Sequence, residues 1–375
     1  MTDLTTPETP LLALDVDRVD ANIARLRARL EGVGVPLRLH VKTAKSVDVA
    51  ARVFPDGPGP ITVSTLAEAE HFADAGYTDI LYAVGIDPHK LPRAAALARR
   101  GVALVLLLDS TVQADAVVEF CRDHAVTLPA LIEIDCDGHR GGVRADSAAL
   151  LEIGRRLAEA GLLRGVLDHA GESYFATTPD AQRSAADAER ATAVDAAERL
   201  RAAGLPCPVV SVGSTPTAHA AADLSGVTEV RAGNFVFFDL VMAGIGVCSL
   251  DDLALSVVVT VIGHHPAQGW ILTDGGWMAT SRDRGTAAQR VDQGYGLVAD
   301  LDGRIIPDLL MVAASQEHGQ LGVRPGSGAT LPALPIGTRL RILPNHACAT
   351  AAQHARYHLT GASAPTGTWS RVNGW

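Results

Sequence analysis

The chain has 375 residues, 47% of them hydrophobic, which is enough for two domains or for one large α/β barrel with an addition. Its formal net charge of −10, without a basic cluster, argues against nucleic acid or a membrane surface as a partner. Five scattered cysteines, together with an N-terminal stretch that lacks signal-peptide features and the absence of any membrane-spanning run, predict a cytoplasmic protein.

Short apolar runs alternate with amphipathic segments over the first two thirds of the chain. An apolar run at 11–17 and a predicted helix at 17–30 come first. Eight strand candidates follow at 37–42, 61–65, 80–85, 103–109, 130–137, 165–170, 208–214 and 229–236. Helix-period segments separate nearly all of them, as is typical of a (β/α)8 barrel of roughly 250 residues. We therefore predict a TIM-like α/β barrel over residues 10–245.

The pattern changes after residue 245. Strand-like runs at 253–265, 269–276, 295–303 and 338–345 are broken by glycine, proline and aspartate, and they show little helical periodicity. These features predict a second, mainly β domain over residues 246–375, with which residues 1–20 can pack.

Two of the three lysines in the chain, Lys42 and Lys45, stand together in the run LRLHVKTAKS. A lysine is required where a side chain must act as nucleophile or exchange a proton, because an amine loses its proton and a guanidinium does not. If the strand extends to residue 42, then Arg38, His40 and Lys42 share one face at its C-terminal end, where barrel enzymes place their chemistry. A solvated pair of surface lysines is the alternative.

Polar residues also follow strands five to eight of the predicted barrel. They are Glu133, Asp135, Arg140, His169, Ser173, Tyr174, Gly213, Ser214, Thr215, Gly233 and Asn234. The last two turns combine glycine with hydroxyl or amide residues and can present N–H and O–H donors to a phosphate, although a simple helix cap looks the same. A lysine and a phosphate site at one barrel mouth are what pyridoxal phosphate requires.

Eight runs, in chain order, resemble the D-serine dehydratase and D-threonine aldolase family. They are HVKTAKS, EIDCDGHRGGV, DHAGESY, VVSVGSTPT, TEVRAGNFVFFD, DGGWMATSRDRG, SQEHG and PNHAC, and the resemblance covers almost the whole chain. Members of this family resemble alanine racemase in fold. The resemblance implies a pyridoxal phosphate barrel like the alanine racemase N-terminal domain, a β domain and a homodimer.

The resemblance also assigns cofactor roles to single positions. It places the Schiff-base lysine at Lys42, the arginine near the pyridine ring at Arg140 and the motif tyrosine at Tyr174. Further cofactor contacts are implied at His40, His169, Ser173, Gly213, Ser214, Thr215, Gly233 and Asn234. Glu172 stands where the motif often has a small residue or histidine, and its role is left open.

A divalent metal is implied at His346 and Cys348, and a substrate contact at His318. In an extended strand, residues two apart share a face, so one imidazole and one thiolate can reach a single ion. That ligand pair favours zinc, with manganese or magnesium as alternatives. In the run SRDRG, Arg282 or Arg284 can bind a substrate carboxylate or form a solvated charge pair.

The activity implied is a dehydratase that converts a D-β-hydroxy-α-amino acid, of the D-threo-3-hydroxyaspartate or D-serine type, to a 2-oxo acid and ammonia. Lys42 would remove the α-proton, and the metal would assist departure of the β-hydroxyl. Aldolase cleavage to glycine and an aldehyde is the alternative, although Cys348 favours the dehydratase. A racemase would need a second base, for which the β region offers only Tyr295 and Tyr357. A non-catalytic pyridoxal phosphate carrier would lack the β domain and the metal pair.

Overall fold

The computed structural model describes residues 4–375, which group into two compact units. The barrel unit consists of Arg25–Gly233 and Val372–Trp375, and the β unit consists of the residues up to Ala24 together with Asn234–Arg371. The division at Gly233 precedes the predicted boundary at 245. The reason is that α9 (Leu240–Gly244) is bonded to the β unit, since the Leu240 N–H donates to the Pro344 carbonyl at 3.0 Å.

Eight parallel strands form a closed barrel in chain order, which confirms the predicted fold class. They are β2 (Leu37–His40), β3 (Ile61–Val63), β4 (Asp79–Gly85), β5 (Ala103–Leu108), β6 (Ala130–Ile134), β7 (Leu163–Asp168), β8 (Val209–Val212) and β9 (Glu229–Ala232). The ring closes where β9 pairs with β2, with Leu37 opposite Val230. Leucines from four adjacent strands, Leu81, Leu107, Leu131 and Leu167, form one buried cluster.

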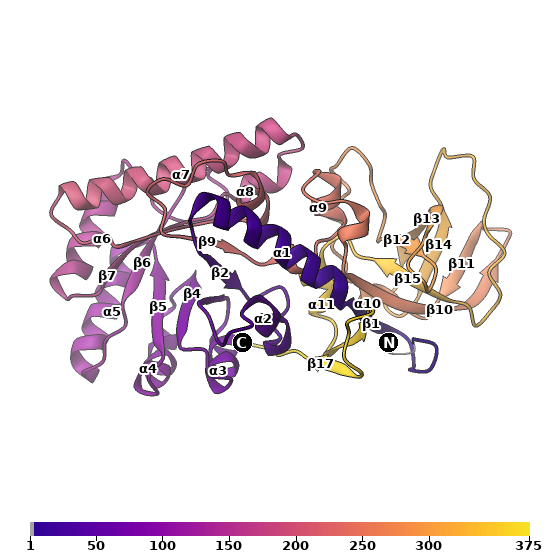
Figure 1. Cartoon of the computed structure of the whole chain (residues 1–375), viewed down its shortest axis with the longest axis horizontal. Coiled ribbons are helices and arrows are strands. Elements are labelled where there is room, and N and C mark those ends of the chain that lie inside the picture. The colour runs from indigo at the N-terminus through magenta and orange to yellow at the C-terminus, as the bar shows by residue number, and fades with distance from the viewer. Residues whose placement is uncertain (1–3) are drawn as a thin grey trace. The chain divides into compact units, whose positions relative to one another are not determined.

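One helix precedes β2, and further helices connect the successive barrel strands (Figure 1). They are α1 (Val16–Val33), α2 (Val47–Val53), α3 (Leu66–Asp74), α4 (Leu91–Arg99), α5 (Thr111–His124), α6 (Ala148–Glu159), α7 (Pro179–Ala202) and α8 (Thr215–Ala220), with 3-10 turns at Pro88–Lys90 and Gly171–Phe175. Side-chain caps start several of them: Ser110 accepts from the Gln113 N–H, and Thr178 accepts from the Ala181 N–H. Each helix returns the chain to the start of the next strand, so the strands end at one common mouth.

The β unit is built on a nine-stranded sheet in the order β11-β14-β13-β12-β15-β10-β1-β16-β17. Its strands are β1 (Leu11–Asp15), β10 (Leu255–His265), β11 (Trp270–Thr273), β12 (Leu297–Ala299), β13 (Ile305–Ala314), β14 (Gly319–Val323), β15 (Arg339–Leu343), β16 (Arg356–Thr360) and β17 (Thr368–Ser370). The N-terminal strand β1 lies inside this sheet, antiparallel to β10 and parallel to β16.

Short helices interrupt the β unit at α10 (Trp277–Thr280) and α11 (Ala347–Ala351), and 3-10 turns lie at Asn234–Val236 and Leu250–Asp252. Strands β13, β14, β16 and β17 were not among the predicted runs. Among residues 4–375, no helix is both long and apolar enough to cross a bilayer.

Candidate active site

Lys42 lies just beyond a strand rather than within one. Strand β2 ends at His40, and the chain then turns, with the Lys45 N–H donating to the Val41 carbonyl at 2.7 Å. The predicted strand alternation through residue 42 is therefore wrong. Lys42 nevertheless lies close to His40: burial, followed by the charge of Lys42, holds the pKa of His40 well below its ordinary value.

Lys45 has a structural role. Its Nζ lies 3.0 Å from Oε1 of Glu68, whose side chain is only 1% exposed, and the other Glu68 oxygen accepts from the Ser64 N–H at 2.9 Å. The Lys45 backbone is left-handed, with φ of 48°, and its carbonyl accepts from the Val372 N–H at 2.8 Å. Because Lys45 neutralises a buried carboxylate, the structure supports Lys42 as the lysine with the chemical role.

His169 follows β7 and shares this part of the barrel mouth. Its Nδ1 donates to the Gly213 carbonyl at 2.9 Å, which leaves Nε2 without a proton. Burial and then the nearby charges of Lys42 and Arg231 lower the pKa of His169 to about 3. The Tyr174 ring lies 6.3 Å from the His169 ring, centroid to centroid. The barrel thus brings Lys42, His169, Tyr174 and, through Lys42, His40 to one site.

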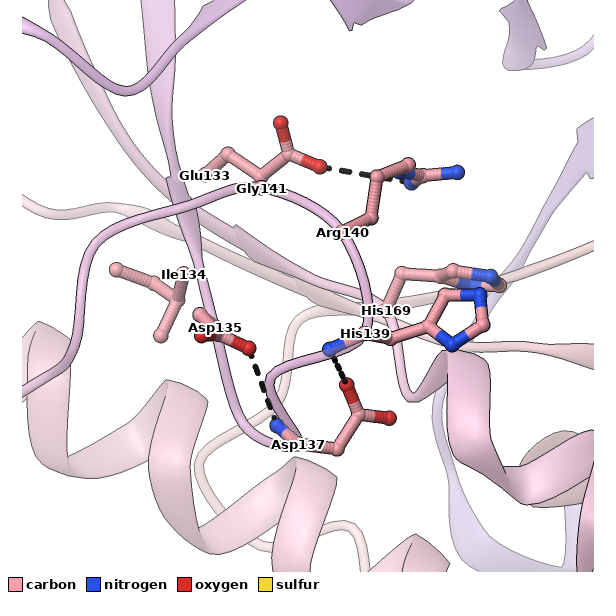
Figure 2. A pocket seen from close by; sticks show the side chains of 8 residues that line it. All are labelled: Glu133, Ile134, Asp135, Asp137, His139, Arg140, Gly141 and His169. Carbon is pink, nitrogen blue, oxygen red and sulfur yellow. Dashed lines mark hydrogen bonds and ion pairs between the residues drawn. The ribbon is translucent and has the colours of Figure 1, made fainter.

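The loop after β6 carries Arg140 and lines a small pocket together with His169 (Figure 2). The Arg140 Nη2 lies 3.6 Å from Glu133 Oε1, and its side chain is 62% exposed. The neighbouring His139 Nδ1 lies 2.7 Å from Glu172 Oε1, and the Glu172 N–H donates to Asp137 at 2.8 Å. Glu172 therefore ties the loop after β7 to the loop after β6, and Arg140 remains available at the mouth.

The turn after β8 is fixed by contacts within the protein. Gly213 has φ of +135°, and a Cβ there would lie 2.2 Å from the Arg231 carbonyl oxygen, so packing alone requires glycine. The Gly213 N–H donates to Glu189 at 3.1 Å, and the Ser214 N–H donates to Thr217 at 2.9 Å. These two N–H groups are not free for a phosphate, contrary to the sequence-based expectation.

Of the hydroxyl groups around this turn, that of Ser214 is hydrogen-bonded within the protein and that of Thr215 is not. The Ser214 Oγ caps α8 and lies 2.9 Å from the Ser173 Oγ. The Thr215 Oγ1, by contrast, is buried and has no hydrogen-bond partner. A buried hydroxyl without a partner costs free energy unless a ligand oxygen accepts its hydrogen bond. The Thr215 hydroxyl and the Lys42 amine together fit the phosphate and the aldehyde of pyridoxal phosphate.

The turn after β9 holds the predicted residues Gly233 and Asn234. A Cβ at Gly233 would lie 2.6 Å from the His40 carbonyl oxygen, so this glycine is also required by packing. The Asn234 amide nitrogen donates to Asp239 at 2.6 Å, and its oxygen can only accept. The amide nitrogen carries a second hydrogen, so both the Asn234 side chain and its backbone N–H stay candidate phosphate contacts.

Two buried charged residues of the mouth were not predicted. Glu189, on α7, accepts from the N–H groups of Ala170 at 2.8 Å and Gly213 at 3.1 Å, and thereby joins the turns after β7 and β8. Arg231, on β9, donates to the Asp168 carbonyl at 2.6 Å and to the Ser211 hydroxyl at 2.8 Å. The sequence carries little signal for either, since a charged residue in a helix or strand usually faces water.

The β unit holds the predicted metal pair at the start of α11. His346 is the extended residue before this helix and Cys348 lies in its first turn, so the expectation of one extended strand is wrong. The two side chains still meet. His346 is hydrogen-bonded to Cys348, and its Nδ1 lies 2.7 Å from Asp283 Oδ2. Desolvation would lower the pKa of His346, but Cys348 and Asp283 outweigh it and raise that pKa to about 11.

The donors of this pair fit a divalent ion. An imidazole nitrogen and a thiolate suit zinc. Within residues 4–375, no group of three or more histidine, cysteine, aspartate or glutamate side chains is placed to hold an ion. The predicted ion site therefore depends on the pair His346 and Cys348 alone. His318, the predicted substrate contact, is exposed between β13 and β14.

Comparison with known proteins relates both units to characterised enzymes. Residues 14–241 match the profile of the alanine racemase N-terminal domain, and residues 254–360 match that of a putative serine dehydratase domain. The chain is 56% identical to D-threo-3-hydroxyaspartate dehydratase of Delftia sp. (strain HT23), over 99% of each chain. It is 28% identical to D-serine dehydratase of Dictyostelium discoideum, over 95% of this chain and 94% of that protein.

Solved structures give the same relationship. The structure of the Delftia dehydratase is similar with a TM-score of 0.97, at 55% identity and with full coverage of both chains. A cysteine-to-alanine variant of that enzyme in its metal-free form is similar with a TM-score of 0.96, at the same identity and coverage. The D-threonine aldolase of Filomicrobium marinum is more distant, with a TM-score of 0.81 and 25% identity, over 98% of this chain and 95% of that protein.

Proposed function

This chain belongs to the D-serine dehydratase and D-threonine aldolase family, and we propose that it is a pyridoxal phosphate- and metal-dependent dehydratase of a D-β-hydroxy-α-amino acid, with D-threo-3-hydroxyaspartate as its first candidate substrate. The observation that carries this proposal is a lysine amine, Lys42, beside two histidines whose pKa values are lowered, at the end of a closed barrel. The choice of reaction is supported by 56% identity to the Delftia dehydratase.

Lys42, Tyr174 and the Thr215 hydroxyl would hold the cofactor in the barrel, while His346 and Cys348 would hold the ion. Pyridoxal phosphate would supply an electron sink for the carbanion at the substrate Cα, and the ion would supply Lewis-acid stabilisation of the departing hydroxyl. The ion is proposed to be zinc, with manganese and magnesium as alternatives. The metal-free form solved for the Delftia variant supports the presence of a metal in that relative.

The residues of the chain would bind the substrate and move its protons. The Lys42 amine takes the proton from the substrate Cα. His40 and His169 stay neutral near pH 7, because their pKa values lie below their ordinary range, so Lys42 remains the main proton acceptor among these three. Arg140 has one ion-pair contact, at 3.6 Å, and a largely exposed side chain, so it can turn toward an anionic group bound at the mouth.

Aldolase cleavage is the second candidate. Aldolase cleavage would use the same lysine and ion, and the structural similarity to the Filomicrobium aldolase supports it as an alternative. We further propose a cytoplasmic homodimer, and its five cysteines without disulfides are consistent with a reducing compartment. Sedimentation of the purified protein measures the oligomeric state.

The reaction is tested by product analysis. Purified protein is incubated with D-threo-3-hydroxyaspartate, D-serine and D-threonine, with and without a chelator, and 2-oxo acid, ammonia and glycine are measured in parallel. A dehydratase gives equimolar 2-oxo acid and ammonia, and the chelator abolishes both. Glycine with an aldehyde would establish the aldolase instead, and turnover that survives complete metal removal would contradict the proposed ion.

A further inference from the structure

Asp283 contacts the proposed metal ligand His346, although 63 residues separate the two in the chain. Its Oδ2 lies 2.7 Å from the His346 Nδ1. A carboxylate accepts hydrogen bonds, so the hydrogen in this contact belongs to the imidazole. Nδ1 therefore carries a hydrogen, and Nε2 is the ring nitrogen left for Cys348 or for an ion shared with it.

Asp283 is itself held by its neighbours. Its N–H donates to the Ser281 Oγ at 2.9 Å, and Ser281 has a left-handed φ of 84°. Its carbonyl accepts from the side chain of Asn345, the residue before His346, at 3.3 Å. A left-handed serine is sterically unfavourable and persists only where surrounding contacts stabilise it. The backbone of Asp283 is thus fixed relative to the start of the ligand segment.

Further bonds join the segment before Asp283 to the segment after His346. The Thr350 hydroxyl, one turn into α11, donates to the Thr280 carbonyl at 2.7 Å. The Asn345 side chain is buried, and it also accepts from the Thr286 hydroxyl at 2.7 Å and donates to the Gly294 carbonyl at 2.7 Å. The two segments form one rigid corner of the β unit, with the Asp283 carboxylate directed at the imidazole.

The two arginines that flank Asp283 are engaged elsewhere. The Arg282 guanidinium lies 5.2 Å from the Trp277 ring centroid. Arg284 donates to Asp292 at 2.7 Å and lies over the Tyr295 ring at 5.0 Å. Of the SRDRG run, the residue that contacts His346 is therefore the aspartate.

We propose that Asp283 is the positioning residue of the metal centre: it holds His346 with the hydrogen on Nδ1 and directs Nε2 toward an ion shared with Cys348. A carboxylate behind a ligating histidine fixes its orientation and raises its basicity, and loss of such a partner weakens metal binding about 10- to 100-fold. This inference rests on the metal in the proposed function.

Zinc titration calorimetry on the metal-depleted full-length protein tests the role. Asp283→Ala should weaken zinc binding by about 10- to 100-fold. Asp283→Asn should weaken it less, because the amide oxygen still accepts from Nδ1 but carries no charge. Asp300→Ala is the matched control and should bind zinc like the wild type. Asp300 has a 40% exposed side chain against 36% for Asp283, and it pairs with Arg304 in the same unit.

Spectroscopy separates positioning from a merely structural effect. With saturating cobalt(II) in place of zinc, Asp283→Ala should keep the thiolate charge-transfer band of Cys348, while its metal-free form unfolds at the same temperature as metal-free Asp300→Ala. Equal zinc affinity of the wild type and Asp283→Ala would overturn the inference alone. If that variant does not fold, Asp283→Leu, which is of similar size and accepts no hydrogen bond, replaces it, and wild-type zinc affinity in Asp283→Leu overturns the inference. A wild type that binds no divalent ion would instead overturn the proposed metal and, with it, this role.

Discussion

The barrel mouth and the proposed metal site of the β unit, His346 and Cys348, set the charge of histidine in opposite directions. In the barrel, the pKa of His169 falls to about 3, and in the β unit the pKa of His346 rises to about 11. Desolvation lowers the pKa of both rings, so it does not explain the contrast. The neighbours do: without cofactor, Lys42 places a positive charge beside His169, whereas Cys348 and Asp283 place negative charge beside His346.

This contrast separates two kinds of chemistry within one chain. A histidine kept neutral beside an amine leaves the amine to exchange protons. A histidine surrounded by acidic groups favours a bound cation, and in the absence of a metal that cation is a proton. The same residue type would therefore serve the proposed acid–base site in one unit and the proposed cation site in the other, according to the charges that the fold places beside it.

Replacement of Lys42 should have the largest effect on the difference between the two sites, because it removes the positive charge beside His169. Lys42→Ala should lower turnover by about 10³-fold or more, because it removes the proposed base. In the cofactor-free protein it should also raise the pKa of His169, since a neighbouring positive charge is gone. Turnover is measured by 2-oxo acid release and the histidine pKa by NMR titration.

Lys90→Ala serves as the control for this variant. Lys90 is the third lysine of the chain and bonds the Tyr82 hydroxyl at 3.3 Å. We expect Lys90→Ala to retain turnover. If Lys42→Ala kept more than a tenth of the wild-type rate, the assignment of the base to Lys42 would be wrong.

The arrangement of elements could be predicted, because it depends on local patterns. The eight barrel strands show as apolar runs between helix-period segments, and all eight occur in the structure. The end of β2 could not be placed, since residues 41–44 contain no glycine or proline and continue the apparent alternation. Only the hydrogen bond from the Lys45 N–H to Val41 shows that the chain has turned.

The partners of the site residues were harder to predict, because they are distant in sequence. Asp283 lies 63 residues from His346, and no sequence motif around either residue predicts their contact. Glu189 lies on the alanine-rich helix α7, where small residues on all sides blur the boundary between buried and exposed faces. Side-chain contacts that span such separations emerge only from the folded barrel and sheet.

The Lys45–Glu68 pair is a second way in which the barrel treats a buried ionisable group. His169 is kept neutral, whereas the buried Glu68 carboxylate is paired with a cation. Lys45→Met leaves the Glu68 carboxylate buried without its cation. The free energy of unfolding should fall by about 2–4 kcal/mol. This loss is near the low end for a broken buried pair, because the Lys45 side chain is 18% exposed. Urea unfolding measures the loss. The double variant Lys45→Met with Glu68→Gln should recover most of it, and an unchanged midpoint in the single variant would show that the pair is not stabilising.

His219 offers a smaller test of the same principle outside the proposed site. Burial lowers the pKa of His219 to about 4, and the charges of Arg25 and Arg29 act in the same direction. A 2.9 Å hydrogen bond from its Nδ1 to the Thr215 carbonyl opposes this shift. The unfolded chain, with an ordinary histidine pKa near 6.5, therefore binds more protons between about pH 4 and 6.5. Stability contributed by neutral His219 is complete above this window and is lost as the pH falls through it.

His219→Gln should flatten the pH dependence of unfolding by up to one proton, about 1.4 kcal/mol per pH unit, inside that window and leave it unchanged above pH 7. Urea unfolding of both proteins at several pH values between 4.5 and 7.5 measures the difference. Equal slopes would mean that His219 takes up a proton in the folded barrel despite two neighbouring arginines. Cationic neighbours would then be insufficient to keep a partly buried histidine neutral, and the contrast between His169 and His346 would need another cause.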